Sequence, residues 1–399
     1  MPPRRERLSP IIVVVVLALI PVGGFAYLAH WATGREIKPV AVQLPVTPVS
    51  TPQLATPVLS VRRAPQTLAA ITNQAGLVNQ LNQVAAFIGP ASCLVAELDG
   101  RTIVNAGGDI PVIPASNEKL ITAAVALDVL GPDYTYSTKL LGTVANGAVS
   151  GNLYFVGGGD PLLATADYPA SVHAPDYPET NTTSLETLVA NLQAAGVTQV
   201  GNVVADDSRY DTERFVPTWD PSIPNVDAGP LGALMVNDAT KKLGTKTRYA
   251  DPALGAATDL IAAMKKAGIK VTGKASLGAA PVATPQLAAV QSAPMSTIVS
   301  EMLTTSDDNT AELVFKELGY HFNQQGTRAS AQQVVQGTLT SWGIDTSKIN
   351  VVDGSGLDSS DTVTCAILLQ VLLHKPLTDP LGQGLAVAGQ TGTLADQFL

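Results

Sequence analysis

The hydrophobic pattern of the chain is clearest in one helix. From Leu120 to Leu130, apolar residues occupy nearly every helical face, which indicates a helix buried on all sides. Pro114 lies just before this segment and Gly131-Pro132 follows it, in agreement with the preferences for proline and glycine at helix ends. We therefore predict a central buried helix whose first turn lies close to Ser116.

Shorter patterns flank this helix. A helix is expected from about Gln74 to Phe87. Two β-type runs, Ser92 to Leu98 and Thr102 to Asn105, then enclose Asp99-Gly100, a dipeptide typical of hairpin turns. Helical spacing resumes at Ser296. The sequence thus predicts a two-stranded ribbon that leads into the central helix, with further helices near the C-terminus.

Residues from about 140 to 290 alternate between helices and valine-rich strands. Leu153 to Val156 is a predicted strand that ends in Gly157-Gly158-Gly159-Asp160-Pro161. The spacing of these glycines does not fit a phosphate-binding loop, so we interpret the run as a tight turn. A helix ending at Ala195 and another from Leu260 to Ala267 are each closed by glycine and followed by a strand. We expect two similar helix–strand units in an inserted α/β module.

Candidate chemistry begins with Ser116 and Lys119, whose spacing places them on one face of the first helical turn. A lysine there meets the positive end of the helix dipole, where acidic residues are preferred. Burial and the dipole both disfavour an ammonium ion, so this amine is expected to act as a general base beside a nucleophilic hydroxyl. The alternative is that Ser116 caps the helix and Lys119 extends into water.

Two later stretches have polar or turn-forming composition. Thr304 to Asn309 separates two helical segments, and it either brings hydroxyl, carboxylate and carboxamide groups to a cleft or simply caps the second helix. Asp353-Gly354-Ser355-Gly356-Leu357 reads as a turn.

Composition limits the class of function. The 399 residues, 46% hydrophobic, suffice for two or more domains, and the formal net charge of −9 argues against a nucleic-acid partner. The four histidines are scattered, so we expect no metal site and no cofactor. Cys93 and Cys365 each lie in an apolar run, and free core thiols are the expected state, with a disulfide as the alternative.

The N-terminus predicts a membrane anchor. Arg4, Arg5 and Arg7 precede Ile11 to Ala29, an uncharged apolar span long enough to cross a bilayer with the N-terminus in the cytoplasm. A cleaved signal peptide is the alternative, but its apolar core should be shorter and end in a recognisable cleavage site. We predict a single-pass protein of the cell membrane, with a proline-rich stalk from Pro39 to Pro65 and the folded part on the extracytoplasmic face.

Several motifs in this order resemble the low-molecular-mass class C penicillin-binding proteins, the D-alanyl-D-alanine carboxypeptidase/endopeptidase family. They are Pro114-Ala115-Ser116-Asn117-Glu118-Lys119-Leu120, Gly157 to Pro161, Ser306-Asp307-Asp308-Asn309 with Ala311-Glu312, and Asp353 to Leu357. The resemblance covers about residue 70 to the last residue. It implies an α+β penicillin-binding/β-lactamase-like serine transpeptidase fold, in which helices pack on an antiparallel sheet.

The resemblance also implies a division of the chain. We assign residues 1–10 to a cytoplasmic tail, 11–32 to the transmembrane anchor, 33–66 to the stalk, 67–140 and 291–399 to the peptidase domain, and 141–290 to the inserted module.

By the same resemblance, Ser116 is the acylated nucleophile, Lys119 its base and Ser306 the residue that passes a proton to the departing D-alanine. The implied substrates are peptidoglycan stem peptides, and β-lactams are implied as covalent inhibitors. The alternatives are an impaired or inactive wall-binding homologue and, with less support, a β-lactamase or esterase.

Two departures from the family motifs qualify this assignment. Asp308 stands where the family's S-x-N motif has asparagine, and Asn309 comes one place later, so either the loop shifts to present Asn309 or substrate binding is weakened. Gln390-Thr391-Gly392 looks like K-T-G, but its neighbours better match the family segment that precedes K-T-G. The resemblance then implies that the K-T-G strand lies beyond Leu399, and that the 399-residue chain alone is neither fully stable nor active.

Overall fold

The computed structural model describes residues 64–168 and 181–397. The predicted anchor and nearly all of the predicted stalk lie outside these residues, so both stay predictions. Among the helices that the structure does describe, none combines the length and the hydropathy needed to span a bilayer. Contacts divide the chain into Met1–Leu68 and Ala69–Leu399, and the folded elements belong to the second unit apart from the start of the first helix.

The first elements are the α2 helix, Ala64–Ala85, and a hairpin of β1, Leu94–Leu98, and β2, Arg101–Ala106. Asp99 (φ 51°) and Gly100 (φ 74°) both adopt the left-handed conformation that a tight hairpin turn requires, so the predicted ribbon is confirmed. The α2 helix begins well before the predicted Gln74. Pro65, which the sequence reading placed in the stalk, lies in the first helical turn, where the missing N–H of proline breaks no hydrogen bond.

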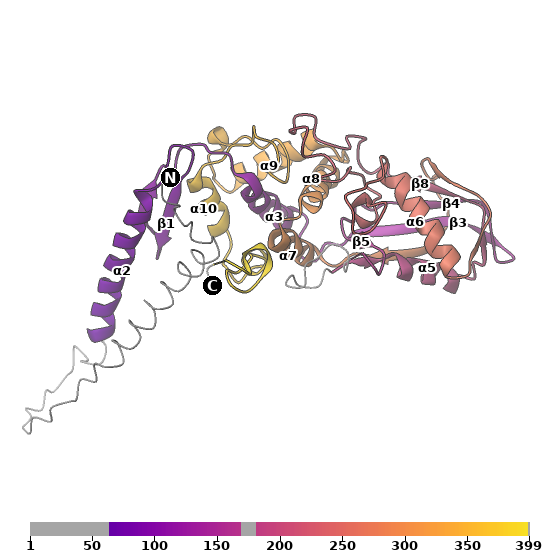
Figure 1. Ribbon diagram of the computed structural model, residues 1–399, viewed down its shortest axis with the longest axis horizontal. Helices are drawn as coiled ribbons and strands as arrows, with labels where there is room; N and C mark the ends of the chain where they lie inside the picture. Colours follow the sequence, from indigo (N-terminus) through magenta and orange to yellow (C-terminus); the bar gives the residue numbers. More distant parts are fainter. Residues whose placement is uncertain (1–63, 169–180, 398–399) are drawn as a thin grey trace, which may run out of the picture. The chain divides into compact units, whose positions relative to one another are not determined.

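A group of helices packs around the predicted central helix (Figure 1). A 3-10 turn, η1 (Ala115–Asn117), leads into α3 (Glu118–Val129), which contacts all of the later helices described next. These are α7 (Met295–Thr305), α8 (Asp308–Asn323), α9 (Arg328–Ser341), α10 (Cys365–Leu373) and α11 (Pro380–Gln383). Ile121 and Val125 on α3 are fully buried, as the all-round apolar pattern predicted.

Within the described residues, seven strands form one mixed sheet in the order β10-β8-β4-β3-β11, and β7 pairs with β4 while β9 pairs with β7. The β11-β3-β4 pairs are antiparallel and the β4-β8-β10 pairs are parallel. The strands are β3 (Ser137–Ala145), β4 (Ala148–Val156), β7 (Gln199–Val200), β8 (Asn202–Asp206), β9 (Lys270–Val271), β10 (Ala275–Leu277) and β11 (Gln286–Gln291).

Two helices cover this sheet, α5 (Leu185–Ala194) and α6 (Pro252–Lys266), as Figure 1 shows. In the chain, α5 is followed by β7 and β8, and α6 is followed by β9 and β10. β7 pairs in parallel with β9, and β8 with β10, so the predicted helix–strand units are present. A short parallel pair, β5 (Leu163–Ala164) with β6 (Thr183–Ser184), lies between β4 and α5 in the sequence. The helices packed around α3 share one hydrophobic core, and the sheet with α5 and α6 has another. The boundaries assigned at residues 140/141 and 290/291 stay a prediction.

The glycine run after β4 is not itself the tight turn that the sequence predicted: Gly157 to Asp160 form neither strand nor turn, and a turn begins only at Pro161. A Cβ atom on Gly157 would lie 2.3 Å from the carbonyl oxygen of Ala233, and one on Gly158 would lie 2.3 Å from the carbonyl oxygen of Ser137. Both glycines are therefore required because another backbone passes against them. The run serves close packing where the chain crosses from the sheet towards the helices.

The two cysteines correct one expectation. Cys93 and Cys365 form a disulfide with a Cα–Cα distance of 5.9 Å, so the expectation of free thiols is wrong. The apolar context of each cysteine gave no signal, because pairing depends on the contact between α10 and β1, which are far apart in sequence. The bridge fastens the hairpin to the helical core.

Replacing both cysteines by serine should lower the free energy of unfolding by about 2–5 kcal/mol, because the disulfide closes a loop of 272 residues and restricts the unfolded chain. Denaturant unfolding of the oxidised protein, the reduced protein and the Cys93→Ser/Cys365→Ser variant measures this. The last two should unfold at similar denaturant concentrations, below that of the oxidised protein. Equal midpoints for all three would contradict the account.

Candidate active site

Ser116 lies in the η1 turn at the entrance to α3, and its side chain is exposed. Ala115, just before it, has a left-handed backbone (φ 48°), which turns the chain sharply at this point. The N-cap of α3 is Asn117, and no side chain caps the helix. The capping alternative for Ser116 is therefore wrong, and its hydroxyl is available to other partners.

Lys119 points into the protein. Its side chain is 1% exposed, so the alternative in which it extends into water is wrong. The amine Nζ donates to Ser116 Oγ at 3.1 Å, to the carbonyl oxygen of Ser355 at 2.9 Å and to Asp308 Oδ1 at 2.6 Å. The proximity of Ser116 and Lys119 that the spacing predicted is observed, but the carboxylate partner was not foreseen.

Ser306 also contacts Ser116. It ends α7 in the left-handed conformation (φ 59°, ψ 41°), and its Oγ lies 3.0 Å from Ser116 Oγ. A residue other than glycine in this conformation stores roughly 1–3 kcal/mol of strain, and such strain is concentrated at functional sites. The structure therefore brings all three predicted catalytic side chains together.

The start of α8 decides between Asp308 and Asn309. Asp307 is the N-cap, since its side chain accepts from the backbone N–H of Thr310, and Asp308 is the first helical residue. Asp308 faces Lys119, whereas Asn309 is buried and its Oδ1 accepts from the backbone N–H of Gly229 at 2.7 Å. The loop does not shift to present Asn309, so only Asp308 of the two predicted substrate-binding residues reaches the site.

The Asp353–Leu357 turn forms a further wall that sequence reasoning had not assigned to the site. Gly356 (φ 80°) lies so close to the nucleophile turn that a Cβ atom would be 1.9 Å from the carbonyl oxygen of Ala115. Thr122 on α3 donates to the carbonyl oxygen of Gly354 at 2.8 Å. This close packing places the Ser355 carbonyl beside Lys119. In the sequence, the two glycines that flank Ser355 were the one sign that this turn packs closely against another segment.

Buried carboxyl groups lie beneath this turn. Glu312 Oε1 accepts from the backbone N–H groups of Gly354 and Ser355, yet burial, followed by the charge of Asp353, raises the pKa of Glu312 to about 8. Burial also raises the pKa of Asp361 to about 8 and that of Glu118 well above its ordinary range. In the part of the chain that the structure describes, no group of acidic, histidine or cysteine residues could hold a metal ion.

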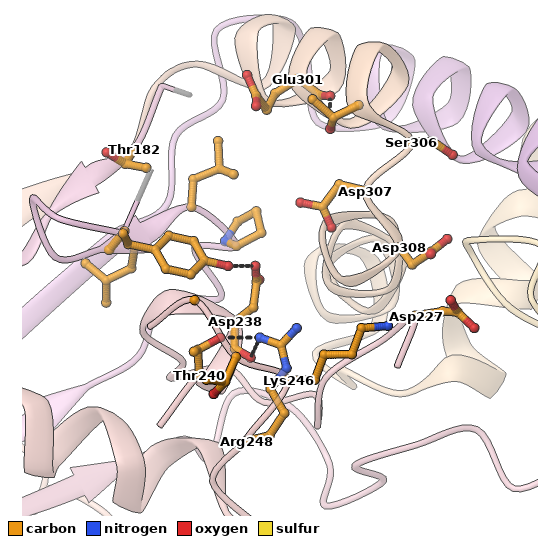
Figure 2. Close-up of a pocket in the computed structure, with 18 residues that line it drawn as sticks. Thr182, Asp227, Asp238, Thr240, Lys246, Arg248, Glu301, Ser306, Asp307 and Asp308 are labelled. Atoms are coloured by element: carbon orange, nitrogen blue, oxygen red, sulfur yellow. Dashed lines mark hydrogen bonds between the residues drawn. The ribbon is translucent and has the colours of Figure 1, made fainter. Parts of the chain in front are cut away.

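A cavity of about 590 Å³ opens beside Ser306 (Figure 2). Glu301 and Ser306 follow one wall, with Asp307 and Asp308 next to them, and Asp238, Thr240 and Arg248 lie across the cavity. Glu301 is 5% exposed, and burial, followed by the charge of Asp307, raises its pKa to about 7. The cavity is thus rich in carboxyl groups, and two of its lining residues, Ser306 and Asp308, contact Ser116 and Lys119 respectively.

The segment Gln390-Thr391-Gly392 forms no strand. The backbone N–H groups of Gln390 and Thr391 both donate to the carbonyl oxygen of Val387, and Gly392–Leu394 is a 3-10 turn. A Cβ atom on Gly392 would lie 2.0 Å from the carbonyl oxygen of Thr304. The segment packs against α7 as a turn, which agrees with the reading that it is not the K-T-G strand.

Comparison with known proteins identifies the family. The sequence matches the D-Ala-D-Ala carboxypeptidase 3 (S13) family over residues 78–245 and 236–399. The chain belongs to this family. The resemblance to the low-molecular-mass class C penicillin-binding proteins is thereby confirmed, and with it the enzyme class, a serine D-Ala-D-Ala carboxypeptidase.

Individual relatives agree with this membership. Carboxypeptidase Rv3627c of Mycobacterium tuberculosis is 30% identical over 415 residues, covering 100% of this chain and 85% of the relative. The D-alanyl-D-alanine carboxypeptidase of Actinomadura sp. (strain R39) is 26% identical over 75% of this chain and 68% of its own length. Penicillin binding protein 4 of Haemophilus influenzae is 21% identical, with a TM-score of 0.62 over 75% of this chain and 78% of that one, which confirms the α+β fold.

The buried carboxyl groups predict an unusual pH dependence of stability. The folded protein holds a proton on Glu312 up to about pH 8, whereas the unfolded chain releases it near pH 4.5. The stabilisation from this group is complete below pH 4.5 and is lost as the pH rises towards 8, by up to about 1.4 kcal/mol per pH unit.

Glu312→Gln keeps the shape but cannot titrate, so its free energy of unfolding should fall less steeply over this pH range than that of the wild type. Denaturant unfolding at several pH values measures both slopes. The exposed Glu97 provides the control, because Glu97→Gln should leave the slope unchanged. A Glu312→Gln slope equal to that of the wild type would show that Glu312 does not titrate as described.

Proposed function

We propose that Ser116 is the nucleophile of a serine D-Ala-D-Ala carboxypeptidase/endopeptidase that acts on peptidoglycan stem peptides. One observation carries the proposal: the amine of Lys119 and the hydroxyl of Ser306 converge on Ser116 Oγ from two helices, at 3.1 Å and 3.0 Å. A nucleophile within hydrogen-bond reach of a base and of a proton carrier has the arrangement that acyl transfer requires.

Acylation follows from these contacts. Lys119, as a neutral amine, takes the proton of Ser116 while Oγ forms a bond to the carbonyl carbon of the scissile amide. When the tetrahedral intermediate collapses, the C–N bond breaks and the departing amine receives, by way of Ser306, the proton that Lys119 had taken, which leaves Lys119 neutral again. The products are an ester on Ser116 and free D-alanine, or a released peptide where the amide is a cross-link.

Deacylation uses the same groups in reverse. A water molecule gives a proton to Lys119 and attacks the ester carbonyl, the bond from carbon to Ser116 Oγ breaks, and Oγ recovers a proton from Lys119. The backbone N–H of Ser116 would be one donor to the oxyanion, and loss of such a donor lowers kcat by roughly 10²–10³-fold in other hydrolases.

The cavity beside Ser306 would receive the substrate. Its volume of about 590 Å³ suits a peptide segment, and Ser306, which lines it at the end of α7, contacts Ser116. The Haemophilus influenzae protein has also been crystallised in complex with a β-lactam, and this fold similarity supports β-lactams as covalent ligands of Ser116.

Asp308 also favours a second candidate, an impaired homologue that binds the cell wall without turnover. An ionised carboxylate can only accept hydrogen bonds, whereas the amide of the family's S-x-N motif can also donate. Release of D-alanine from a peptide ending in D-Ala-D-Ala supports the first candidate. Retention on insoluble peptidoglycan without such release supports the second.

Ser116→Ala should abolish covalent labelling by a fluorescent penicillin and the release of D-alanine, because no other residue would carry the acyl group. Ser276→Ala, the same change at an exposed position on β10 of the sheet, should label like the wild type. Labelling intensity and the mass of the labelled peptide are the readouts. Labelling of Ser116→Ala at the wild-type level would refute the assignment of the nucleophile.

A further inference from the structure

The hydrogen bonds around Lys119 leave it one direction for catalysis. Asp308 Oδ1 and the Ser355 carbonyl oxygen both accept from Nζ, so two N–H groups of the amine are committed to them. The remaining direction points to Ser116 Oγ. In the neutral amine a lone pair faces the hydroxyl and can take its proton, whereas in the ammonium ion an N–H group faces it and cannot. The charge on Lys119 therefore decides whether Ser116 has a base.

Asp308 favours the ammonium ion. Its Oδ1 lies 2.6 Å from Nζ, the shortest of the three contacts, and the two side chains are only 16% and 1% exposed. Opposite charges at this separation, with little water between them, attract strongly. Burial raises the pKa of Asp308 to about 6, although Lys119 opposes the shift. Above that pH the residue is a carboxylate, and the ion pair is complete.

Other charged groups face this pair, but none replaces Asp308. Asp307 and Asp227 lie close enough to Asp308 to raise its pKa. Further charged or titratable groups come from the cavity and from the segments packed around α3: Asp238, Lys246, Arg248, Glu301, Glu118, Glu312, Asp353 and Asp361. Of all these carboxyl groups within the described residues, only that of Asp308 accepts a hydrogen bond from Lys119.

We propose that Asp308 is a positioning residue that holds Lys119 as an ammonium ion and so shifts the acylation of Ser116 to alkaline pH. The inference rests on the proposed function of Ser116 and Lys119. It departs from the earlier expectation for this position, in which the replacement of asparagine affects substrate binding. In this proposal the Asp308 carboxylate acts on the base, Lys119, so replacing Asp308 should change the pH profile of acylation.

The test measures the second-order rate constant for acylation of the native full-length protein by a fluorescent penicillin, from mildly acidic to alkaline pH. In Asp308→Asn the midpoint of the alkaline rise should move down by about 1–3 pH units, because an opposite charge at this distance shifts a titration by that amount. At neutral pH this variant should be acylated at least about tenfold faster, since one pH unit is a factor of ten in the neutral amine.

Asp307→Asn is the matched control. It removes the neighbouring negative charge and keeps a residue that caps α8 well, but Asp307 does not contact Lys119, so its midpoint should move less. Asp308→Ser, a smaller neutral substitution, repeats the test independently, and cooperative unfolding shows that each variant is folded.

The outcomes separate the two proposals. Acylation of the wild type and Asp308→Asn with one common midpoint overturns the inference and leaves the proposed function intact. No acylation of either protein at any pH overturns both. Acylation of the variant alone supports the inference in its strongest form. A wild type acylated fastest at mildly acidic pH overturns the inference without any variant.

Discussion

A buried lysine needs an acceptor for each N–H group, because an unpaired charge away from water is strongly unfavourable. Lys119 meets this requirement with acceptors from three parts of the chain: the nucleophile turn, the start of α8 and the Asp353–Leu357 turn. The nucleophile turn adjoins Lys119 in sequence, whereas the contacting residues of the other two segments are 189 and 236 residues away from it. The Lys119 amine therefore links the nucleophile turn, the start of α8 and the Asp353–Leu357 turn to one another.

Several local backbone features allow these three segments to meet at Lys119. Gly354 and Gly356 allow the turn to pack against α8 and the nucleophile turn, where a Cβ atom would collide with Phe315 and Ala115. Ser306 adopts a left-handed backbone conformation at the end of α7, and its side chain contacts Ser116. Because other helices pack against α3, the side chain of Lys119 is almost completely buried.

Local features were predictable from the sequence, and long-range ones were not. The apolar pattern of α3, the Asp99-Gly100 turn and the two helix–strand units act over a few residues and were read correctly. The motifs also identified Ser116, Lys119 and Ser306, which the structure brings together. The Cys93–Cys365 bridge and the partner of Lys119 depend on elements far apart in the chain, so no local pattern could show them. The orientation of Asp308 rather than Asn309 was left open for the same reason.

The Lys119–Asp308 ion pair is the shortest of the three contacts that the Lys119 amine makes, and a double-mutant cycle measures its strength directly. The free energies of unfolding of the wild type, Lys119→Met, Asp308→Asn and the double variant are needed. Each single change leaves one partner buried without its counter-charge, whereas the double change removes both charges. The account predicts that the double variant loses less stability than the sum of the single losses, by about 1–3 kcal/mol. Losses that add to within about 0.5 kcal/mol would show that the two residues are not coupled and would contradict the account.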